Sequence, residues 1–251
     1  MRINVGHILF ESASFYKKNF KKLIDISLGA ACTSFISTAQ TQIMGYMQAT
    51  SNNVPLWFLL FSIVTGILTL IVTVKLALAM PILVNSLFDE NGMTAIQAFR
   101  QTKGKFWLSI RCSLLVGLLY IIPLIAIMLL KTPFASVIIT ICIAFISALY
   151  YTLSPMIAVE PKTNRYLRRS VKMIKGNYIP ALLLTLITVT ALSVMNGALI
   201  YLFQDNSAAV FIVRIMYTVA YFFTGPFAGI TSVMVYRQLK TTVTDSTISE
   251  F

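Results

Sequence analysis

Four charged side chains of this sequence lie within long apolar runs, where an ionisable group is a candidate for function by default. Such groups could relay a proton, line an ion path or contact a charged ligand. The same groups could instead form structural ion pairs or extend to the lipid headgroups. The four residues are Asp25, Lys75, Arg111 and Arg214.

A structural interpretation is available for three of these charges. Asp25 can form an ion pair with Lys21, Lys22 or a basic residue of a neighbouring helix, and we favour this over a proton relay. Lys75 and Arg111 lie close enough to the ends of their apolar runs for the side chain to reach cytoplasmic headgroups.

Arg214 leaves two interpretations open. It lies about two turns inside the outer end of the last apolar run, as judged from the rise of a helix. We favour an outward orientation or an ion pair with Asp205, which precedes it in the loop. Contact with a substrate or a partner helix is the alternative.

The residue types needed for catalysis do not come together in this sequence. His7 is the single histidine, so a histidine-based metal cluster or triad cannot form. Cys32, Cys112 and Cys142 lie in apolar runs without the spacing of a metal site. There is no P-loop, and the carboxylates within apolar runs are not paired as in an aspartyl protease. We therefore expect no enzymatic activity and no metal or cofactor.

The composition predicts an all-α, polytopic membrane protein. Hydrophobic residues make up 57% of the 251 residues and charged residues only 11%, against about 25% in soluble domains. Apolar runs of ~20 residues can each cross a ~30 Å hydrocarbon core as a helix. We expect a single integral membrane domain, 1–251, with six transmembrane helices. Their expected ranges are 23–44, a second starting at 55, 106–130, 134–154, 179–203 and 208–235. The second apolar run continues to residue 88 and is too long for one straight crossing, so we expect a span followed by a bent segment along the cytoplasmic interface.

The distribution of positive charge predicts the orientation. The formal net charge is +12, and 17 of the 20 Lys and Arg residues fall on one side of the predicted spans. By the positive-inside rule that side is cytoplasmic, which places both termini inside the cell (N-in/C-in). Anionic lipid headgroups are the expected partner of these charges, and nucleic acid is not, because no basic domain stands outside the membrane.

Three short basic segments predict an internal repeat of a cytoplasmic amphipathic helix followed by a helical hairpin. The amphipathic helices are expected at 7–22, 93–103 and 162–175, and the repeat units at 7–88, 93–160 and 162–236, with a polar tail at 237–251. Gly104 and Gly176 are 72 residues apart. Pro81, Pro155 and Pro226, near the cytoplasmic ends of the even-numbered spans, are separated by 74 and 71 residues.

Each predicted joint between amphipathic helix and span has the same chemistry. A small residue stands five positions before a lysine, in the pairs Ser12–Lys17, Ala98–Lys103 and Ser170–Lys175. Gly104 or Gly176 should end the first helix in a left-handed conformation, and Asn19 or Asn177 should cap the next one. The first joint is the weakest copy because Lys18 replaces the glycine.

The third amphipathic helix carries the densest positive charge. Leu167, Val171 and Ile174 should share its apolar face. The basic residues that flank this face are Arg165, Arg168, Arg169, Lys172 and Lys175. We favour a simple lipid-interface corner, and a platform for anionic lipid or an acidic partner is the alternative.

The two better joints resemble the multi-span membrane domain of bacterial glycerophosphodiester phosphodiesterases and its stand-alone membrane-protein relatives. The resemblance rests on Pro81 followed by Lys103-Gly104-Lys105-Phe106-Trp107, and on Pro155 followed by Lys175-Gly176-Asn177-Tyr178. It covers the middle half of the chain. In those fusions the phosphodiesterase activity belongs to a separate soluble domain, so the resemblance implies no catalytic residue here.

These observations favour a non-catalytic protein of the bacterial cytoplasmic membrane. We expect an accessory or protective component, acting through its bundle and basic face in envelope lipid homeostasis or in the handling of membrane-active peptides. The alternative is a permease subunit, served by a separate transporter ATPase or another membrane subunit, with the polar first span and Arg214 lining the route. A third possibility, the membrane half of a split enzyme, would need a soluble partner chain.

Overall fold

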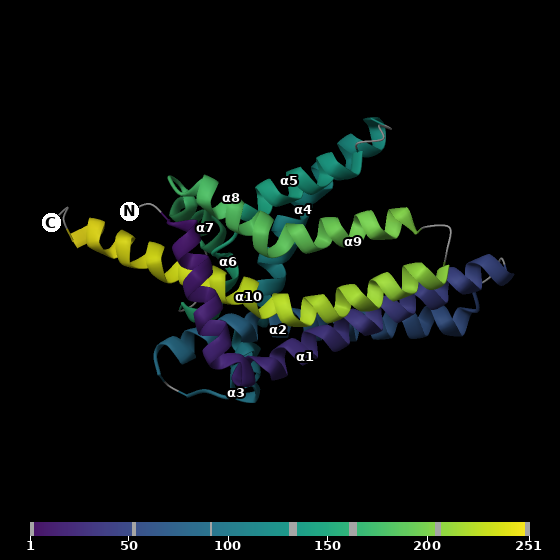
Figure 1. Ribbon diagram of the computed structural model, residues 1–251, viewed down its shortest axis with the longest axis horizontal. Coiled ribbons are helices and arrows are strands. Elements are labelled where there is room, and N and C mark those ends of the chain that lie inside the picture. Colours follow the sequence, from purple (N-terminus) through teal and green to yellow (C-terminus); the bar gives the residue numbers. More distant parts are fainter. Residues whose placement is uncertain are drawn as a thin grey trace.

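The computed structural model describes residues 3–51, 54–90, 92–130, 135–160, 165–203 and 207–248, and within these ranges the fold is all helical (Figure 1). The first half comprises α1 (Val5–Ser51), α2 (Leu56–Phe88), α3 (Ala95–Gln101) with a 3₁₀ turn (Thr102–Gly104), and α4 (Phe106–Leu130). The second half comprises α5 (Ala135–Leu149), α6 (Leu153–Val159), α7 (Tyr166–Ile174), α8 (Tyr178–Thr185), a π-helical segment (Leu186–Thr190), α9 (Ala191–Leu202) and α10 (Ser207–Ile248).

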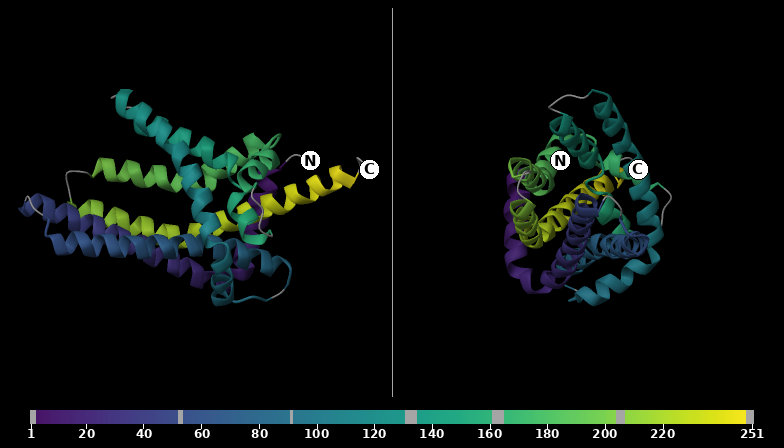
Figure 2. Two further views of the ribbon diagram at one scale, coloured as in Figure 1. Left: turned by 180° about the vertical axis from the view of Figure 1, so that it is seen from behind. Right: turned by 90° about the vertical axis from the view of Figure 1, so that its right-hand side faces the viewer.

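The long helices run along the long axis of the molecule, and both chain ends lie toward the same end of it (Figure 1). Two contacts show that α1 and α2 are antiparallel: the side chain of Gln40 donates to Thr65, and Gly29 lies against Leu76. The hairpin of α4 and α5 diverges from α1, α2 and α10 toward its far end (Figure 2).

Three stretches are long and apolar enough to cross a membrane by themselves: Leu56–Phe88, Cys142–Val159 and Ala208–Thr241. A fourth is added if Ala95–Gly104 and Phe106–Ile121, which meet at 76°, form one broken span. Among the described residues, α1 does not qualify, because serine, threonine and glutamine lower its hydropathy. Six spans, a threefold repeat and the orientation therefore stay predictions.

The predicted boundary between the first amphipathic helix and the first span is wrong. α1 continues from Val5 to Ser51, and Lys18 and Asn19 lie within it. Asn19 does not cap a new helix, since its Nδ2 donates to the carbonyl of Phe15 at 3.1 Å. No glycine or proline interrupts the chain here, so the helix bends without ending, and Figure 1 shows its first part crossing the end of the bundle.

The second joint has the expected break. Thr94 forms a capping box with Gln97, which starts α3. The 3₁₀ turn then redirects the chain into α4, whose bounds agree with the predicted span. The predicted polar tail begins inside α10, which continues past Arg237 to Ile248.

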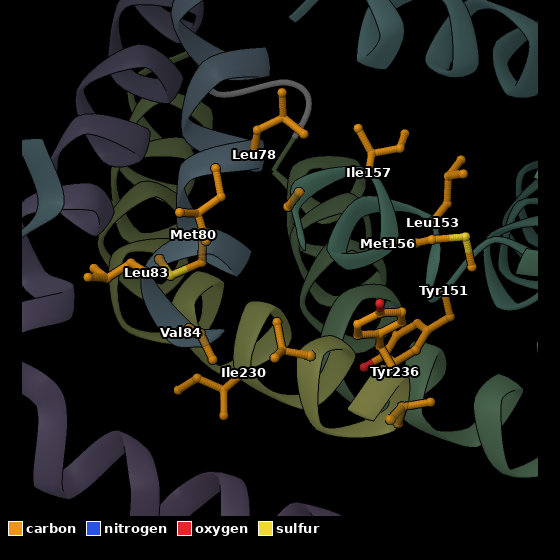
Figure 3. Packing of buried hydrophobic residues seen from close by; sticks show 14 of the residues in the cluster. Leu78, Met80, Leu83, Val84, Tyr151, Leu153, Met156, Ile157, Ile230 and Tyr236 are labelled. Carbon is orange, nitrogen blue, oxygen red and sulfur yellow. The ribbon is translucent and has the colours of Figure 1, made fainter. Parts of the chain in front are cut away.

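Close packing is concentrated at the end that holds the short helices. Leu83 of α2, Met156 of α6 and Ile230 of α10 are fully buried there, and Figure 3 shows them among other core side chains of these helices. Farther along the molecule, large apolar side chains of α2, α4 and α10 are exposed, such as Leu60, Leu118 and Met216. A well-packed end beside an apolar exterior is the pattern expected of a membrane-embedded bundle.

Candidate functional site

A cavity of about 770 Å³ lies among α1, α2 and α10. Half of its lining residues carry a hydroxyl group, and none is charged. The α1 side is one helical stripe, because positions three and four apart share a face. The hydroxyl-bearing residues of this stripe are Ser27, Thr33, Ser34, Ser37 and Thr38.

The other two long helices contribute stripes with the same spacing. Gly66, Thr69 and Thr73 line the cavity from α2, and Tyr217 and Tyr221 line it from α10. Small and hydroxyl-bearing residues on a membrane helix commonly mediate close helix packing. The structure shows that part of the polar face of α1 instead borders a cavity.

The three repeated prolines are all buried near one end of the cavity. Pro81 and Pro226 line it directly, and Pro155 follows the lining residue Ser154. The Ser154 hydroxyl donates to the carbonyl of Ala77 at 3.1 Å, so a backbone oxygen one turn before Pro81 finds a partner. A proline lacks the N–H that would normally bond such a carbonyl.

Glycines allow the helices to approach closely at this end. A Cβ added at Gly229 would stand 2.5 Å from Cγ of Met80, and one at Gly29 would stand 3.2 Å from Leu76. Small residues at such crossings let helix backbones pack tightly in a membrane.

Several hydroxyls in the cavity have no side-chain hydrogen bond to any described residue: those of Ser34, Thr69, Thr73, Tyr217 and Tyr221. Others are occupied within the protein. Tyr151 shares a hydrogen bond of 2.7 Å with Thr231, for example. Hydroxyls without a side-chain partner in the protein are available to bond a ligand in this cavity.

Two of the four sequence-predicted charges lie apart from this cavity. Asp25 and Arg111 are both exposed. Neither belongs to an ion pair within the part of the chain that the structure covers, so the predicted pairing of Asp25 with Lys21 or Lys22 is not found there.

Lys75 and Arg214 each contact a neighbouring helix. The Lys75 ammonium lies 5.3 Å from the ring centre of Phe99 and 6.0 Å from that of Phe106, a cation–π arrangement at the α3–α4 corner. Arg214 Nη1 donates to Oε1 of Gln42 on α1 at 3.2 Å. Its other predicted partner, Asp205, lies outside the described residues. Arg214 is not among the residues lining the cavity, although Tyr217, one turn farther along, is.

The buried carboxylate of Glu160, which the sequence analysis did not identify as a candidate, binds side chains of two helices near the basic segment around α7. Glu160 is only 5% exposed, and Arg169 binds it with both terminal nitrogens, at 2.6 and 3.2 Å. The Tyr236 hydroxyl donates to the same carboxylate at 2.9 Å. One buried acid thus joins α7 to α10, and the paired geometry is the strong form of an arginine–carboxylate contact.

Lys105 completes this cluster from the start of α4. Its ammonium donates to the backbone carbonyls of Ala158 and Glu160. Burial lowers the pKa of Lys105, and the Glu160 carboxylate opposes that shift. The cluster therefore ties the start of α4 to the segment that follows α6.

The apolar face of α7 agrees only in part with the predicted one, of which Ile174 is fully buried and Leu167 packs against the core. Tyr166, Ser170, Met173 and Ile174 are the buried residues, whereas Leu167 and Val171 are only partly covered. The buried face is thus rotated from the predicted one, and in this orientation Arg169 reaches Glu160. Arg165, Arg168, Lys172 and Lys175 remain exposed, so the free basic face has four members rather than five.

The glycines at the joints behave differently from each other. Gly176 has φ of 90°, as predicted for a glycine that ends a helix. Gly104 lies in the 3₁₀ turn without a positive φ, so the prediction is wrong at this position. Asn177 precedes α8 but makes no side-chain cap, and its Oδ1 accepts a hydrogen bond from the backbone N–H of Ile3 at 2.9 Å.

The small residue of each joint has a common environment. Ser12, Ala98 and Ser170 are each 0% exposed. The Ser12 hydroxyl contacts the sulfur of Met234 at 3.1 Å, and the Ser170 hydroxyl contacts that of Thr152 at 3.0 Å. These positions allow the interfacial segments to pack closely on the core, which explains why the pattern requires a small side chain.

Comparison of this chain with family models, with curated proteins and with solved structures gives no match. The resemblance to the membrane domain of glycerophosphodiester phosphodiesterases therefore stays a prediction. Groups of three or more His, Cys, Asp or Glu residues able to hold a metal ion are absent from the residues that the structure places.

Proposed function

We propose that this protein is a non-catalytic component of the bacterial cytoplasmic membrane with six spans and both termini in the cytoplasm. It acts as an accessory or protective factor, in envelope lipid homeostasis or in the handling of membrane-active peptides. It does so by accommodating an amphipathic molecule within its helical bundle while its basic end binds anionic headgroups.

The observation that carries this proposal is the cavity among α1, α2 and α10. A volume of about 770 Å³ lies within the range of roughly 300–1,000 Å³ typical of ligand sites. The cavity offers hydroxyls but contains no histidine, carboxylate or cysteine that could serve as acid, base or nucleophile. Such a lining supports binding rather than catalysis.

The exposed charges support attachment to anionic lipid. Arg165, Arg168, Lys172 and Lys175 belong to the segment around α7, which lies at the end of the molecule that holds the termini (Figure 1). Basic residues beside a membrane attract anionic headgroups by about 1 kcal/mol each. The same residues would place this end on the cytoplasmic side.

The test is a deletion strain challenged with membrane-active peptides and agents that perturb the envelope. It is complemented with the wild type, with Gly66→Phe and with Gly117→Phe. At both glycines an added Cβ meets no atom within 4 Å, but only Gly66 lines the cavity. We expect the wild type and Gly117→Phe to restore resistance and Gly66→Phe to fail at equal expression. Full rescue by Gly66→Phe, or no sensitivity of the deletion strain, would count against the proposal.

A permease is the second candidate, and the hydroxyl stripe of α1 favours it. The lining residues run from Ile26 to Thr38, ~18 Å along the helix axis. A partner ATPase would then supply the energy. Efflux of a labelled membrane-active peptide from energised cells that falls on energy depletion and requires this protein would favour the permease over simple binding.

A further inference from the structure

The lining of the cavity restricts the charge of its ligand. Among the described residues no charged side chain lines it, and Arg214, one turn before the lining residue Tyr217, donates to Gln42. An ionised group placed there would lose its hydration without gaining a counter-ion, which costs several kcal/mol. A phosphate or carboxylate headgroup is therefore disfavoured, and so is an ammonium group.

The same lining is suited to neutral polar groups. Ser34 of α1, Thr73 of α2 and Tyr221 of α10 line the cavity from three sides, and their hydroxyls have no side-chain hydrogen bond to another described residue. A hydroxyl can both donate and accept a hydrogen bond, so these residues match a ligand hydroxyl or ester carbonyl. Leu70, Leu76 and Met80 provide apolar surface in the same cavity. Polar and apolar groups side by side indicate an amphiphile.

The cavity is open on its side. Leu70 and Tyr221 line it, yet they are 60% and 38% exposed. They belong to α2 and α10, two of the three stretches long and apolar enough to cross a membrane alone. If the bundle is embedded as proposed above, this opening faces hydrocarbon, and the ligand enters from the bilayer rather than from water.

We propose that the cavity binds a neutral lipid with a free hydroxyl group, of the diacylglycerol class. This inference rests on the proposed function, because it needs the bundle to lie in a membrane. The glycerol hydroxyl and ester carbonyls bond the hydroxyls of α1, α2 and α10. One acyl chain lies along Leu70, Leu76 and Met80, and the other leaves through the opening beside Tyr221.

The experiment measures binding of radiolabelled diacylglycerol to the purified full-length protein in nanodiscs of neutral phospholipid. The competitors are phosphatidic acid, which has the same chains with a charged phosphate, and glycerol, which has the hydroxyls without chains. We expect saturable binding that unlabelled diacylglycerol displaces at least tenfold better than either competitor. Equal competition by phosphatidic acid would overturn the neutral-ligand assignment, and equal competition by glycerol would overturn the lipid assignment.

Variants locate the site. Gly66→Phe fills the cavity and should weaken binding at least tenfold, whereas Gly117→Phe should leave it unchanged. Because a bulky substitution could impair folding, Tyr217→Phe and Tyr221→Phe serve as a second test, since they remove only hydroxyls. Each lost hydrogen bond should weaken binding by roughly 3- to 10-fold. Unchanged binding in Gly66→Phe, Tyr217→Phe and Tyr221→Phe would overturn the assignment of the ligand to this cavity.

The outcomes separate this inference from the proposed function. If diacylglycerol does not bind, but Gly66→Phe still fails to rescue the deletion strain, then the ligand class is wrong and the function stands. If diacylglycerol binds at this site but the deletion strain has no phenotype, then the binding site stands and the proposed role is wrong.

Discussion

At the scale of single residues, two glycines with the same predicted role should respond differently to substitution. Gly176→Ala places a Cβ on a backbone with φ of 90° and should cost about 1–2 kcal/mol. Gly104→Ala meets no atom within 4 Å and needs no positive φ, so it should change stability by less than about 0.5 kcal/mol. Thermal unfolding of the two variants in detergent checks this, and equal midpoints would contradict the assigned conformations.

The buried acid allows a second test at this scale. Glu160→Gln keeps the shape of the side chain but removes the charge that Arg169 and Tyr236 bind, and it should cost about 1–3 kcal/mol. Glu11→Gln is the matched control, because the Glu11 side chain is 52% exposed and its one ion pair among the described residues is with the exposed His7, with an expected effect below about 0.5 kcal/mol. A Glu160→Gln protein that melts with the wild type would show that the pair contributes no net stability.

Glu160 illustrates what the sequence did not reveal. It is a lone carboxylate between an apolar stretch and a strongly basic helix, a setting that should have indicated an ion pair. Its partner could not be chosen from several nearby basic residues, because the pairing depends on how α7 rotates against α10. Asp25 and Arg111 were predicted as candidate functional charges because they lie in apolar runs, and both side chains are exposed.

At the scale of elements, the rotated face of α7 changes how its charges should be tested. The triple variant Arg168→Gln, Lys172→Gln, Lys175→Gln removes exposed charge and leaves the Arg169–Glu160 pair intact. We expect it to lower recovery of the detergent-solubilised protein on anionic liposomes by several-fold at low salt, with little change in melting temperature. Adding Arg169→Gln should lower the melting temperature as well. Unchanged liposome recovery of the triple variant would contradict the lipid-binding face.

Element boundaries were predictable where the chain carries local signals. The capping box at Thr94 and the glycine at 176 are such signals, and α3, α4 and α7 begin or end close to the predicted positions. The first joint failed because Lys18 and Asn19 are compatible with a continuous helix, so the bend of α1 depends on tertiary packing. The cavity was likewise unpredictable, since it arises from the juxtaposition of stripes on α1, α2 and α10, each of which alone indicates ordinary helix packing.

At the scale of the whole molecule, the open question is whether α1 crosses the membrane. It fails a hydropathy criterion that Leu56–Phe88 passes. Part of its polar face, however, lines the cavity among α1, α2 and α10, and polar residues of membrane helices commonly face a neighbouring helix or a cavity, so low hydropathy does not argue against a span. The 22 residues predicted to cross, 23–44, give ~33 Å of helix, enough for a ~30 Å core.

Labelling of single introduced cysteines tests whether α1 crosses the membrane. The background protein has Cys32, Cys112 and Cys142 replaced by alanine. Val54→Cys and Phe203→Cys should react with a membrane-impermeant maleimide in intact cells, because both lie between helices at the end remote from the termini. Glu11→Cys, Lys103→Cys and Lys175→Cys should react only after the membrane is permeabilised. Because Glu11 lies in the first turns of α1 and Val54 follows its last residue, labelling of both from the same side would show that α1 does not cross. The cavity would then lie outside the bilayer, and both the six-span arrangement and the supply of its ligand from the membrane would be wrong.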